Sequence, residues 1–570
     1  MPVTVLDVPF EARYEASKIG AKYDKNLGLW TVDNREPKLA ECVAKYGCED
    51  YSYARWIEDD INHFVKPAHV SKTQFTPHKH QVEDGKLIKQ AYDRGFQGFL
   101  IASGTGCGKT LSITDGICNI AGKNRLKVLI VCPKAVIPTW RQTLQSYSQK
   151  TKNCRFLIIN YQQLQKLIVE PKTAKTAKTV RTRNRRIAQH GTPKIRFDII
   201  VFDEAHYLKN YPKSAMSMAA VTLMDGLSAY SKGKSPFVIS GTATPATNPL
   251  ELAVLSPWLS ICVANKNTPI PPNKWGEFLQ KQGFHVKQTK AGWAWSQTQW
   301  WDKSDKQAQN RQIEQEHAAD TAKIAAGFGR TYAPFIQRKP TDIAGWQEQQ
   351  VIPLPLDLGV EGKIAYNLAW TVFRQKLNLA ARKKDSNSAL VETLRFRQKA
   401  SLLKAQEIAD FAEMQVKGGN QVFIGCEFIE TVDAITRILQ GKHVSCAEYS
   451  GRNVENRENE RIRFQTGEAK VVLCTTVAGV SFHAGETLKN GETATRTPRI
   501  TIIADVRSRV LDTKQQIGRC HRDGQNSVCY IPYAESTIDE RIITTFAQKI
   551  ANMETMLGDN LDDFLVNFLK

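Results

Sequence analysis

The sequence predicts an α/β protein with two domains built on parallel sheets, a small N-terminal α+β module and an inserted subdomain. Two sets of short apolar segments, separated by helical stretches, support the two sheets, because strands covered on both faces read as apolar runs. The first set includes 128–131 and 199–202, and the second includes 422–425, 471–474 and 500–504. The interval between the sets matches neither pattern, which indicates an insertion.

The N-terminal segment differs from both sets. Apolar and polar positions alternate over 6–10, small apolar residues recur at helical spacing over 12–21, and 30–32 reads as a short strand. This pattern predicts an independent α+β module. The predicted divisions are the N-terminal module at 1–68, the first sheet domain at 69–262, a Trp-, Gln- and Lys-rich subdomain at 263–350, the second sheet domain at 351–545 and a helical tail at 546–570.

The charge balance predicts a polyanionic partner. The 570 residues contain 78 Lys and Arg against 57 Asp and Glu, a formal net charge of +21, and such an excess favours nucleic acid. No apolar run approaches the roughly 18 residues that cross a bilayer, and the N-terminus lacks the order of a signal peptide, so no membrane partner is expected. The 12 cysteines include no Cys-x-x-Cys pair, which favours a reducing intracellular compartment over a zinc ribbon or a disulfide framework.

A glycine-rich loop follows the apolar strand 98–101 and precedes a helix expected to begin near Leu111. The loop reads Ser103-Gly104-Thr105-Gly106-Cys107-Gly108-Lys109-Thr110. Strand, glycine loop and helix are the context of a P-loop: backbone N–H groups surround nucleotide phosphates, Lys109 reaches the β and γ oxygens, and Thr110 binds magnesium.

A second half-site follows the buried strand 198–203. It reads Asp203-Glu204-Ala205-His206. A strand that ends at Asp203 places this carboxylate where it can hold magnesium, and Glu204 can then orient and deprotonate the attacking water. Together with Lys109, these residues complete a predicted triphosphate site.

Two arginines lie near the end of the second sheet domain, in the segment Gln515-Gln516-Ile517-Gly518-Arg519-Cys520-His521-Arg522. Arg519 and Arg522 are three residues apart, a spacing that predicts one face of a helix. Guanidinium groups are suited to neutralising charge on a transferring phosphoryl group. We therefore expect both arginines to act in catalysis.

Together these segments resemble the superfamily 2 helicase-type motors, and their spelling is similar to the Swi/Snf branch. The resemblance covers residues 75–545 and rests on Val131-Cys132-Pro133 ahead of Trp140, Asp203 to Asn210, Ser240-Gly241-Thr242, Gln515 to Gln525 and Thr537 to Ile542. It implies two RecA-like domains, ATP and Mg²⁺ as ligands, and contacts to the nucleotide from Gln81, His206 and Gln515. It also implies a nucleic-acid track formed by Lys134, Trp140, Tyr161, Thr242, Ser450, Thr475 and Thr476.

Within this branch, three segments are most similar to the HARP/HepA-related annealing helicases. They are Trp275 to Phe278, Gly292 to Trp295, and Leu394 to Lys404. The N-terminal module resembles a small accessory domain that is fused to DNA-processing enzymes.

Two parts of the sequence allow more than one interpretation. The segment from Lys172 to Arg186 lies in a stretch that is free of acidic residues from Pro171 to Phe197. We expect it to be a mobile surface loop that is solvated, contacts nucleic-acid phosphates or serves as a nuclear-import signal. Trp293, Trp295, Trp300 and Trp301 either pack inside the inserted subdomain, which we favour, or stack on bases.

The sequence thus predicts a nucleic-acid-stimulated ATPase that moves along one strand of duplex DNA. The expected partner is duplex or branched DNA, the expected state is a monomer, and the expected location is the cytoplasm of a prokaryotic or phage-infected cell, or the nucleus of a eukaryotic one. One alternative is a helicase that separates strands of DNA or RNA. Another is a nucleic-acid-binding scaffold that uses ATP as a clamp.

Overall fold

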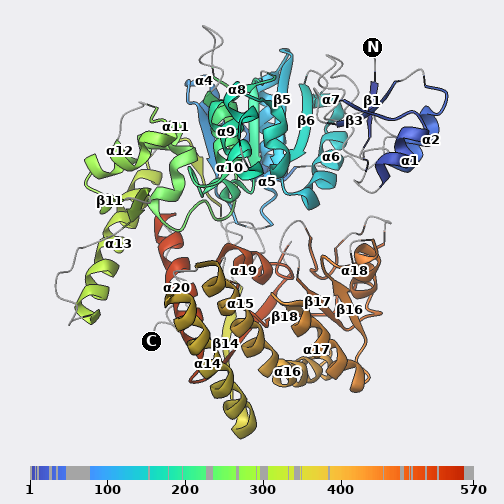
Figure 1. Ribbon diagram of the computed structural model, residues 1–570, viewed down its shortest axis with the longest axis vertical. Coiled ribbons are helices and arrows are strands. Elements are labelled where there is room, and N and C mark those ends of the chain that lie inside the picture. The colour runs from blue at the N-terminus through green and yellow to red at the C-terminus, as the bar shows by residue number, and fades with distance from the viewer. Residues whose placement is uncertain are drawn as a thin grey trace. The chain divides into compact units, whose positions relative to one another are not determined.

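Figure 1 shows the computed structural model of the chain, which forms two compact units: Met1–Ser103 with Gly108–Gln337, and Gly104–Cys107 with Arg338–Lys570. The structure describes residues 3–6, 8, 12–24, 29–33, 36–46, 77–104, 106–151, 154–177, 179–195, 197–225, 235–264, 269–289, 292–295, 306–330, 333–338, 347, 349–382, 386–453, 455–475, 480–486, 488, 492–507, 510–522 and 525–557.

A six-stranded sheet forms the centre of the first unit, in the order β13-β4-β10-β9-β5-β6. Every neighbouring pair in it is parallel, which confirms the predicted sheet. Its strands are β4 (Gly98–Ile101), β5 (Leu126–Cys132), β6 (Cys154–Asn160), β9 (Ile199–Asp203), β10 (Phe237–Gly241) and β13 (Phe335–Ile336). Helices α4 (Lys79–Asp93), α5 (Lys109–Ala121), α6 (Ile137–Ser146), α10 (Ala215–Asp225) and α11 (Ser256–Ala264) belong to the same unit.

The register of this sheet brings three strand ends together. Gly241 of β10 lies opposite Ile101 of β4 on one side and opposite Asp203 of β9 on the other. The loops that follow these strands therefore leave the same edge of the sheet. In open α/β sheets this carboxyl edge is where ligands bind.

The described part of the N-terminal module combines a three-stranded antiparallel sheet with helices, which agrees with the predicted α+β class. Its sheet order is β1-β3-β2, and the elements are β1 (Val3–Leu6), α1 (Arg13–Lys18), β2 (Lys22–Asp24), β3 (Leu29–Asp33) and α2 (Leu39–Tyr46). Ala16, Val32 and Cys42 lie in its core. The module therefore has a small apolar core of its own.

The inserted subdomain contains α12 (Trp275–Lys281), β11 (Val286–Thr289), β12 (Gly292–Trp295) and α13 (Lys306–Phe328). Trp293 packs so closely on Gly276 that an added Cβ there would strike its ring. Trp295 donates a hydrogen bond of 2.9 Å to buried Asp320 and stacks on His317. Packing thus accounts for both tryptophans, whereas Trp300 and Trp301 lie outside the described residues.

The basic segment is helical, so the prediction of a loop was wrong. It forms α8 (Lys172–Lys175) and α9 (Val180–His190), placed between the paired short strands β7 (Ile168–Val169) and β8 (Thr192–Pro193). Thr179 caps α9 by accepting a hydrogen bond from the N–H of Thr182. The cap and the ion pair between Arg183 and Glu170 stabilise helix against the repulsion of like charges.

A second six-stranded parallel sheet lies in the second unit, in the order β14-β19-β18-β15-β17-β16. Its strands are β14 (Val351–Leu356), β15 (Gln421–Gly425), β16 (Cys446–Tyr449), β17 (Val471–Cys474), β18 (Arg499–Ile503) and β19 (Ser527–Ala534). The accompanying helices are α14 (Gly359–Arg382), α15 (Ser386–Leu403), α16 (Ala405–Lys417), α17 (Ile429–Gly441), α18 (Arg457–Gln465), α19 (Val510–Ile517) and α20 (Ile538–Met556).

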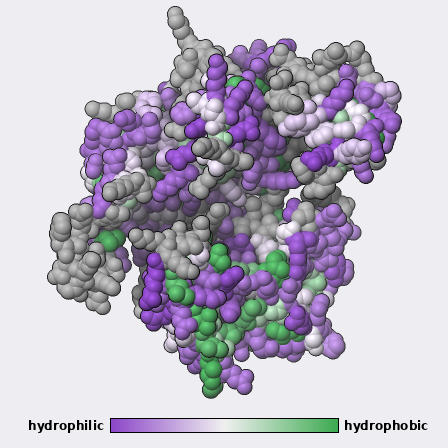
Figure 2. All heavy atoms as spheres, in the orientation of Figure 1, coloured by the Kyte–Doolittle hydropathy of each residue, from purple (hydrophilic) through white to green (hydrophobic). Residues whose placement is uncertain are grey.

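Helices α14 and α15 carry exposed apolar side chains, and Figure 2 shows these gathered on one face. On α14 they include Val360, Ile364 and Leu368, which recur every four residues. Among the described residues, no helix combines the length and apolar character needed to cross a membrane.

Candidate active site

The predicted P-loop is a tight turn between β4 and α5. Gly106 and Gly108 have φ angles of 89° and 72°, in the left-handed region that favours glycine. A Cβ at Gly108 would also collide with the side-chain amide of Gln81. Lys109 folds over the turn, and its Nζ donates a hydrogen bond of 3.0 Å to the carbonyl of Ser103. Thr105 lies outside the described residues.

Gln81 lies against this turn because of the way α4 begins. Its Oε1 accepts a hydrogen bond of 2.9 Å from the backbone N–H of His78, in a capping box at the first turn of the helix. Gln81 is buried. The structure therefore brings Gln81 and the glycine loop together, although they are well separated in the sequence.

Asp203 and Glu204 occupy the end of β9, next to the loop that follows β10. Asp203 is buried and Glu204 is half-buried. Glu204 has a φ of 58° and precedes the 3-10 helix η5 (Ala205–Leu208). Non-glycine residues rarely adopt this conformation, which costs about 1–3 kcal/mol and recurs at functional sites.

Two aromatic residues fix the position of Asp203. The Nε1 of Trp140, on α6, donates a hydrogen bond of 2.7 Å to Oδ2 of Asp203. The hydroxyl of Tyr161, which follows β6, donates one of 2.8 Å to the backbone carbonyl of Asp203. Burial raises the pKa of Tyr161 well above its usual value, so this hydroxyl stays a donor.

His206 joins the β9 and β10 loops. Its Nδ1 lies 3.2 Å from Oγ1 of Thr242 and 3.2 Å from Oε2 of Glu204. The predicted nucleotide residue His206 thus contacts both the predicted general base and the segment after β10.

The side chains at this edge fit a phosphate-bound divalent cation. Burial, followed by the adjacent carboxylate of Glu204, raises the pKa of Asp203 above its ordinary value, and Lys109 opposes this rise only in part. Adjacent, poorly solvated carboxylates are stabilised by a nearby cation. Asp203 and the half-buried hydroxyl-bearing Thr110 are hard oxygen donors of the kind Mg²⁺ prefers.

The arginine segment of the second unit differs from the prediction of a helical face. Helix α19 ends at Ile517, so it carries Gln515 but neither arginine. Arg519 is buried, and its Nη1 donates a hydrogen bond of 2.6 Å to the carbonyl of Val480. Arg522 is half-buried and pairs through its backbone with Gln525. Gly518, a poor helix former, is the first residue after the helix.

The predicted nucleic-acid residues fall into two groups. Lys134 is exposed at the 3-10 helix η3 (Lys134–Val136), and Thr475 is half-buried just after β17. Thr476 lies outside the described residues. The remaining four side chains are buried: Trp140, Tyr161, Thr242 and Ser450. A buried side chain cannot contact a phosphate at the surface, so we leave these four out of the proposed nucleic-acid contacts.

Sequence reasoning missed Arg507, which ties three parts of the second unit together. Its Nη2 donates hydrogen bonds of 2.6 Å to the carbonyl of Cys426, after β15, and 2.5 Å to that of Thr475, after β17. Its backbone N–H donates to Oγ1 of Thr513 in α19. Arg507 thus positions Thr475 and the start of α19. No local motif marks this role, because the partners are distant in the sequence.

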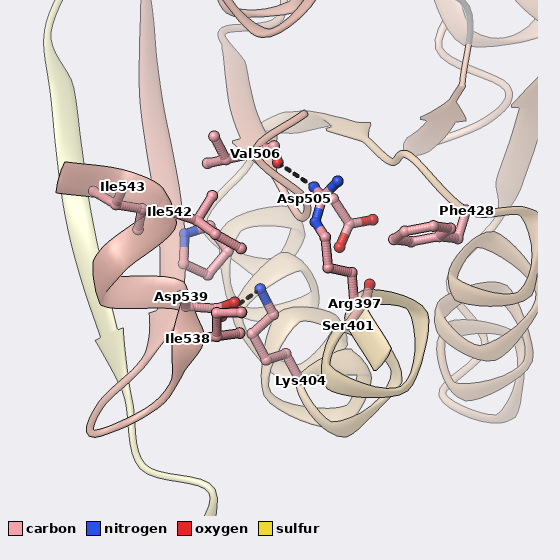
Figure 3. A pocket seen from close by; sticks show the side chains of 11 residues that line it. Arg397, Ser401, Lys404, Phe428, Asp505, Val506, Ile538, Asp539, Ile542 and Ile543 are labelled. Atoms are coloured by element: carbon pink, nitrogen blue, oxygen red, sulfur yellow. Dashed lines mark hydrogen bonds and ion pairs between the residues drawn. The ribbon is translucent and has the colours of Figure 1, made fainter. Parts of the chain in front are cut away.

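A pocket in the second unit takes in part of the segment from Leu394 to Lys404. Figure 3 shows its charged groups turned toward partners, with Lys404 bonded to Asp539 and Arg397 bonded to the carbonyl of Val506. Arg397 also pairs with Glu427 at 2.6 Å. These cations are already neutralised or satisfied within the fold. We therefore regard them as structural.

Comparison with known families identifies both halves of this arrangement. Residues 74–247, which contain Gln81, the glycine loop and Asp203, match the model of the type III restriction enzyme res subunit. Residues 403–524, which contain Arg519 and Arg522, match the helicase conserved C-terminal domain.

Three known proteins are similar to this chain over most of its length. A putative ATP-dependent RNA helicase of Acanthamoeba polyphaga mimivirus is 23% identical over 487 residues, which cover 81% of this chain and 80% of the relative. The Sulfolobus solfataricus SWI2/SNF2 ATPase core in complex with dsDNA is 16% identical with a TM-score of 0.30, covering 88% of this chain and 98% of that one. The Sulfolobus solfataricus SWI2/SNF2 ATPase core domain is also 16% identical, with a TM-score of 0.31, covering 88% of this chain and 94% of that one.

Segments similar to both helicase-type domains are present in order, each within its own parallel sheet, with the glycine-rich turn and the paired carboxylates in the first segment. The chain is an ATP-hydrolysing enzyme of the helicase type.

Proposed function

We propose that this ATPase is a double-stranded DNA translocase of the Swi/Snf type. Two features carry the proposal. The sequences of its motifs, which include Val131-Cys132-Pro133 and the segment from Gln515 to Gln525, resemble the Swi/Snf branch, and the chain has a net charge of +21. A strongly basic protein binds DNA chiefly through phosphates, and duplex DNA presents more charge per length than a single strand. The finer similarity to annealing helicases is part of the same proposal.

In the proposed reaction, the glycine loop and residues of the first unit hold the ATP. Backbone N–H groups of the glycine loop and Lys109 bind the phosphates, and Gln81 contacts the adenine. Thr110 and Asp203 would hold Mg²⁺, which when bound would neutralise phosphate charge. Trp140 and Tyr161 orient Asp203 through the two hydrogen bonds described above.

Glu204 acts as the general base. Its carboxylate accepts a proton from water as the oxygen attacks the γ-phosphorus, and the bond from that phosphorus to the β,γ-bridging oxygen breaks. ADP and inorganic phosphate are the products. We propose that Arg522 neutralises charge that develops during this step and that Arg519 supports its loop from within the second unit.

A strand-separating helicase that acts on RNA or DNA is the second candidate. Similarity to the mimiviral putative ATP-dependent RNA helicase favours it. An ATP-clamped scaffold is a weaker alternative, because a clamp can dispense with Glu204 and Arg522 and this chain retains both.

The proposal is tested by measuring ATP turnover with duplex DNA, branched DNA, single-stranded DNA and single-stranded RNA at equal phosphate concentration. Glu204→Gln serves as the control for contaminating ATPases. We expect duplex or branched DNA to stimulate turnover most. Maximal stimulation by single-stranded RNA would favour the second candidate instead.

A further inference from the structure

The helical insertion between β7 and β8 has no role in the ATP site. Its two strands close it at the base, with Ile168 opposite Pro193 and Val169 opposite Thr192. No acidic residue occurs from Pro171 to Phe197. A segment of one charge sign that is nevertheless helical must be held by contacts with its surroundings.

Two of its arginines provide these contacts. Arg183 forms two hydrogen bonds of 2.6 Å, from Nε and Nη2, to the carboxylate of Glu170. Arg186 donates one of 2.6 Å from Nη1 to the carbonyl of Thr173 in α8. Ala188 is buried, and its carbonyl accepts a hydrogen bond from Thr222 of α10. The insertion is thus a fixed part of the first unit.

Three other cations of the insertion have no such task. Lys172, Lys175 and Arg185 are exposed, and among the described residues they make no hydrogen bond or close ion pair, although the charge of Lys175 helps Arg183 to lower the pKa of Glu170. Holding like charges on two adjacent helices is electrostatically unfavourable unless an external anion relieves the repulsion. We call these three residues the basic face.

We propose that the basic face is an auxiliary contact for the phosphate backbone of duplex DNA, outside the helicase motifs. This inference rests on the proposed function and adds a binding surface to it. Because the cations are flexible side chains on short helices and read no bases, the contact is electrostatic and independent of sequence. Each phosphate neutralised by such a cation contributes about 0.9 to the slope of log affinity against log salt concentration.

The test compares two variants of the full-length chain that lose the same charge. One is Lys172→Gln/Lys175→Gln/Arg185→Gln. The control is Lys86→Gln/Lys123→Gln/Arg125→Gln, which removes three exposed cations of the same unit, from α4 and from the segment between α5 and β5. Affinity for a fluorescent duplex is measured by anisotropy over a range of KCl concentrations, with thermal unfolding and ATP turnover without DNA as checks on folding.

We expect the basic-face variant to lower the salt slope by about 2–3, with unchanged unfolding temperature and unchanged turnover in the absence of DNA. The control should keep the wild-type slope. Equal slopes in the two variants and the wild type would overturn the inference, while duplex-stimulated turnover in that same wild type would leave the proposed function standing. Absence of any duplex binding by the wild type would overturn both.

Discussion

The indole Nε1 of Trp140 donates a 2.7 Å hydrogen bond to Oδ2 of Asp203. Both side chains are buried, and they come from different elements of the first unit. A tryptophan that the family resemblance associates with nucleic acid is therefore a positioning residue for the proposed magnesium ligand. A hydrogen bond to a charged group contributes about 1.5–3 kcal/mol, more than a neutral one.

Trp140→Phe should lower the maximal rate of ATP hydrolysis about tenfold and raise the Mg²⁺ concentration needed for half-maximal rate, because the carboxylate loses its donor. The measurement is steady-state turnover against Mg²⁺ concentration. Trp258→Phe is the matched control: Trp258 is also buried in the first unit, and its Nε1 has no hydrogen-bond partner among the described residues. Equal losses of turnover in the two variants would show that Trp140 acts only through packing and not through its hydrogen bond.

Lys109→Ala and Glu204→Gln should fail in different ways. Without Lys109, a phosphate contact is lost, so both ATP affinity and turnover should fall. Glu204→Gln keeps the shape of the side chain but cannot accept the proton, so ATP should still bind while hydrolysis slows at least about 100-fold. Equilibrium binding of ATP and single-turnover hydrolysis separate the two. Near-normal turnover in both variants would contradict the site.

Substitutions of Arg519 and Arg522 should also have different effects. Arg522→Ala should leave ATP binding and the unfolding temperature nearly unchanged and reduce DNA-stimulated turnover by about 10³-fold, the typical effect of removing an arginine that neutralises phosphoryl charge. Arg519→Ala leaves the carbonyl of Val480 without its donor, which should cost about 1–3 kcal/mol of unfolding free energy. Thermal unfolding and turnover are measured in parallel. If Arg522→Ala changed neither the basal nor the stimulated rate, its proposed role would be wrong.

The ion pair between Lys404 and Asp539 should contribute to the stability of the second unit and not to the rate of ATP hydrolysis. Its Nζ and Oδ2 atoms are 2.8 Å apart, and the Lys404 side chain is only 4% exposed. Lys404→Met leaves a buried carboxylate unpaired, which should lower the unfolding free energy of the second unit by about 3–5 kcal/mol. Urea unfolding followed by circular dichroism measures this change.

Lys417→Met is the control for this pair. Lys417 lies 2.7 Å from Glu413 but is 73% exposed, so its loss should cost less than about 1 kcal/mol. Similar losses of unfolding free energy in the two variants would show that burial does not make the Lys404 ion pair more important for stability.

The nucleotide half of the site was largely predictable because its residues lie in continuous segments. The glycine loop follows β4 directly and Asp203 ends β9, so local sequence places them once the parallel sheet is inferred. The contacts that orient Asp203 were not predictable, since Trp140 and Tyr161 reach it only through the packing of other elements. The same is true of Arg507 and its bond to Thr475.

Two predictions failed for reasons that the sequence contains. Helix α19 ends at Ile517, next to the poor helix former Gly518, so the spacing of Arg519 and Arg522 alone was a poor guide to a helical face. Thr179 caps α9 and Glu170 neutralises Arg183, so an acid-free segment still folds as helix. Charge composition was therefore a poor guide to this segment, which also buries Ala174 and Ala188.

Displacement of a third strand from duplex DNA tests the central claim most directly. A motor that tracks one strand of an intact duplex must push off a triplex-forming strand as it moves, and it needs no wedge to split a fork. The assay uses ATP with the wild type, Glu204→Gln as the inactive control, and a forked duplex in parallel. We predict ATP-dependent release of the third strand by the wild type alone and little opening of the fork. Efficient fork opening with no third-strand release would contradict the translocase assignment.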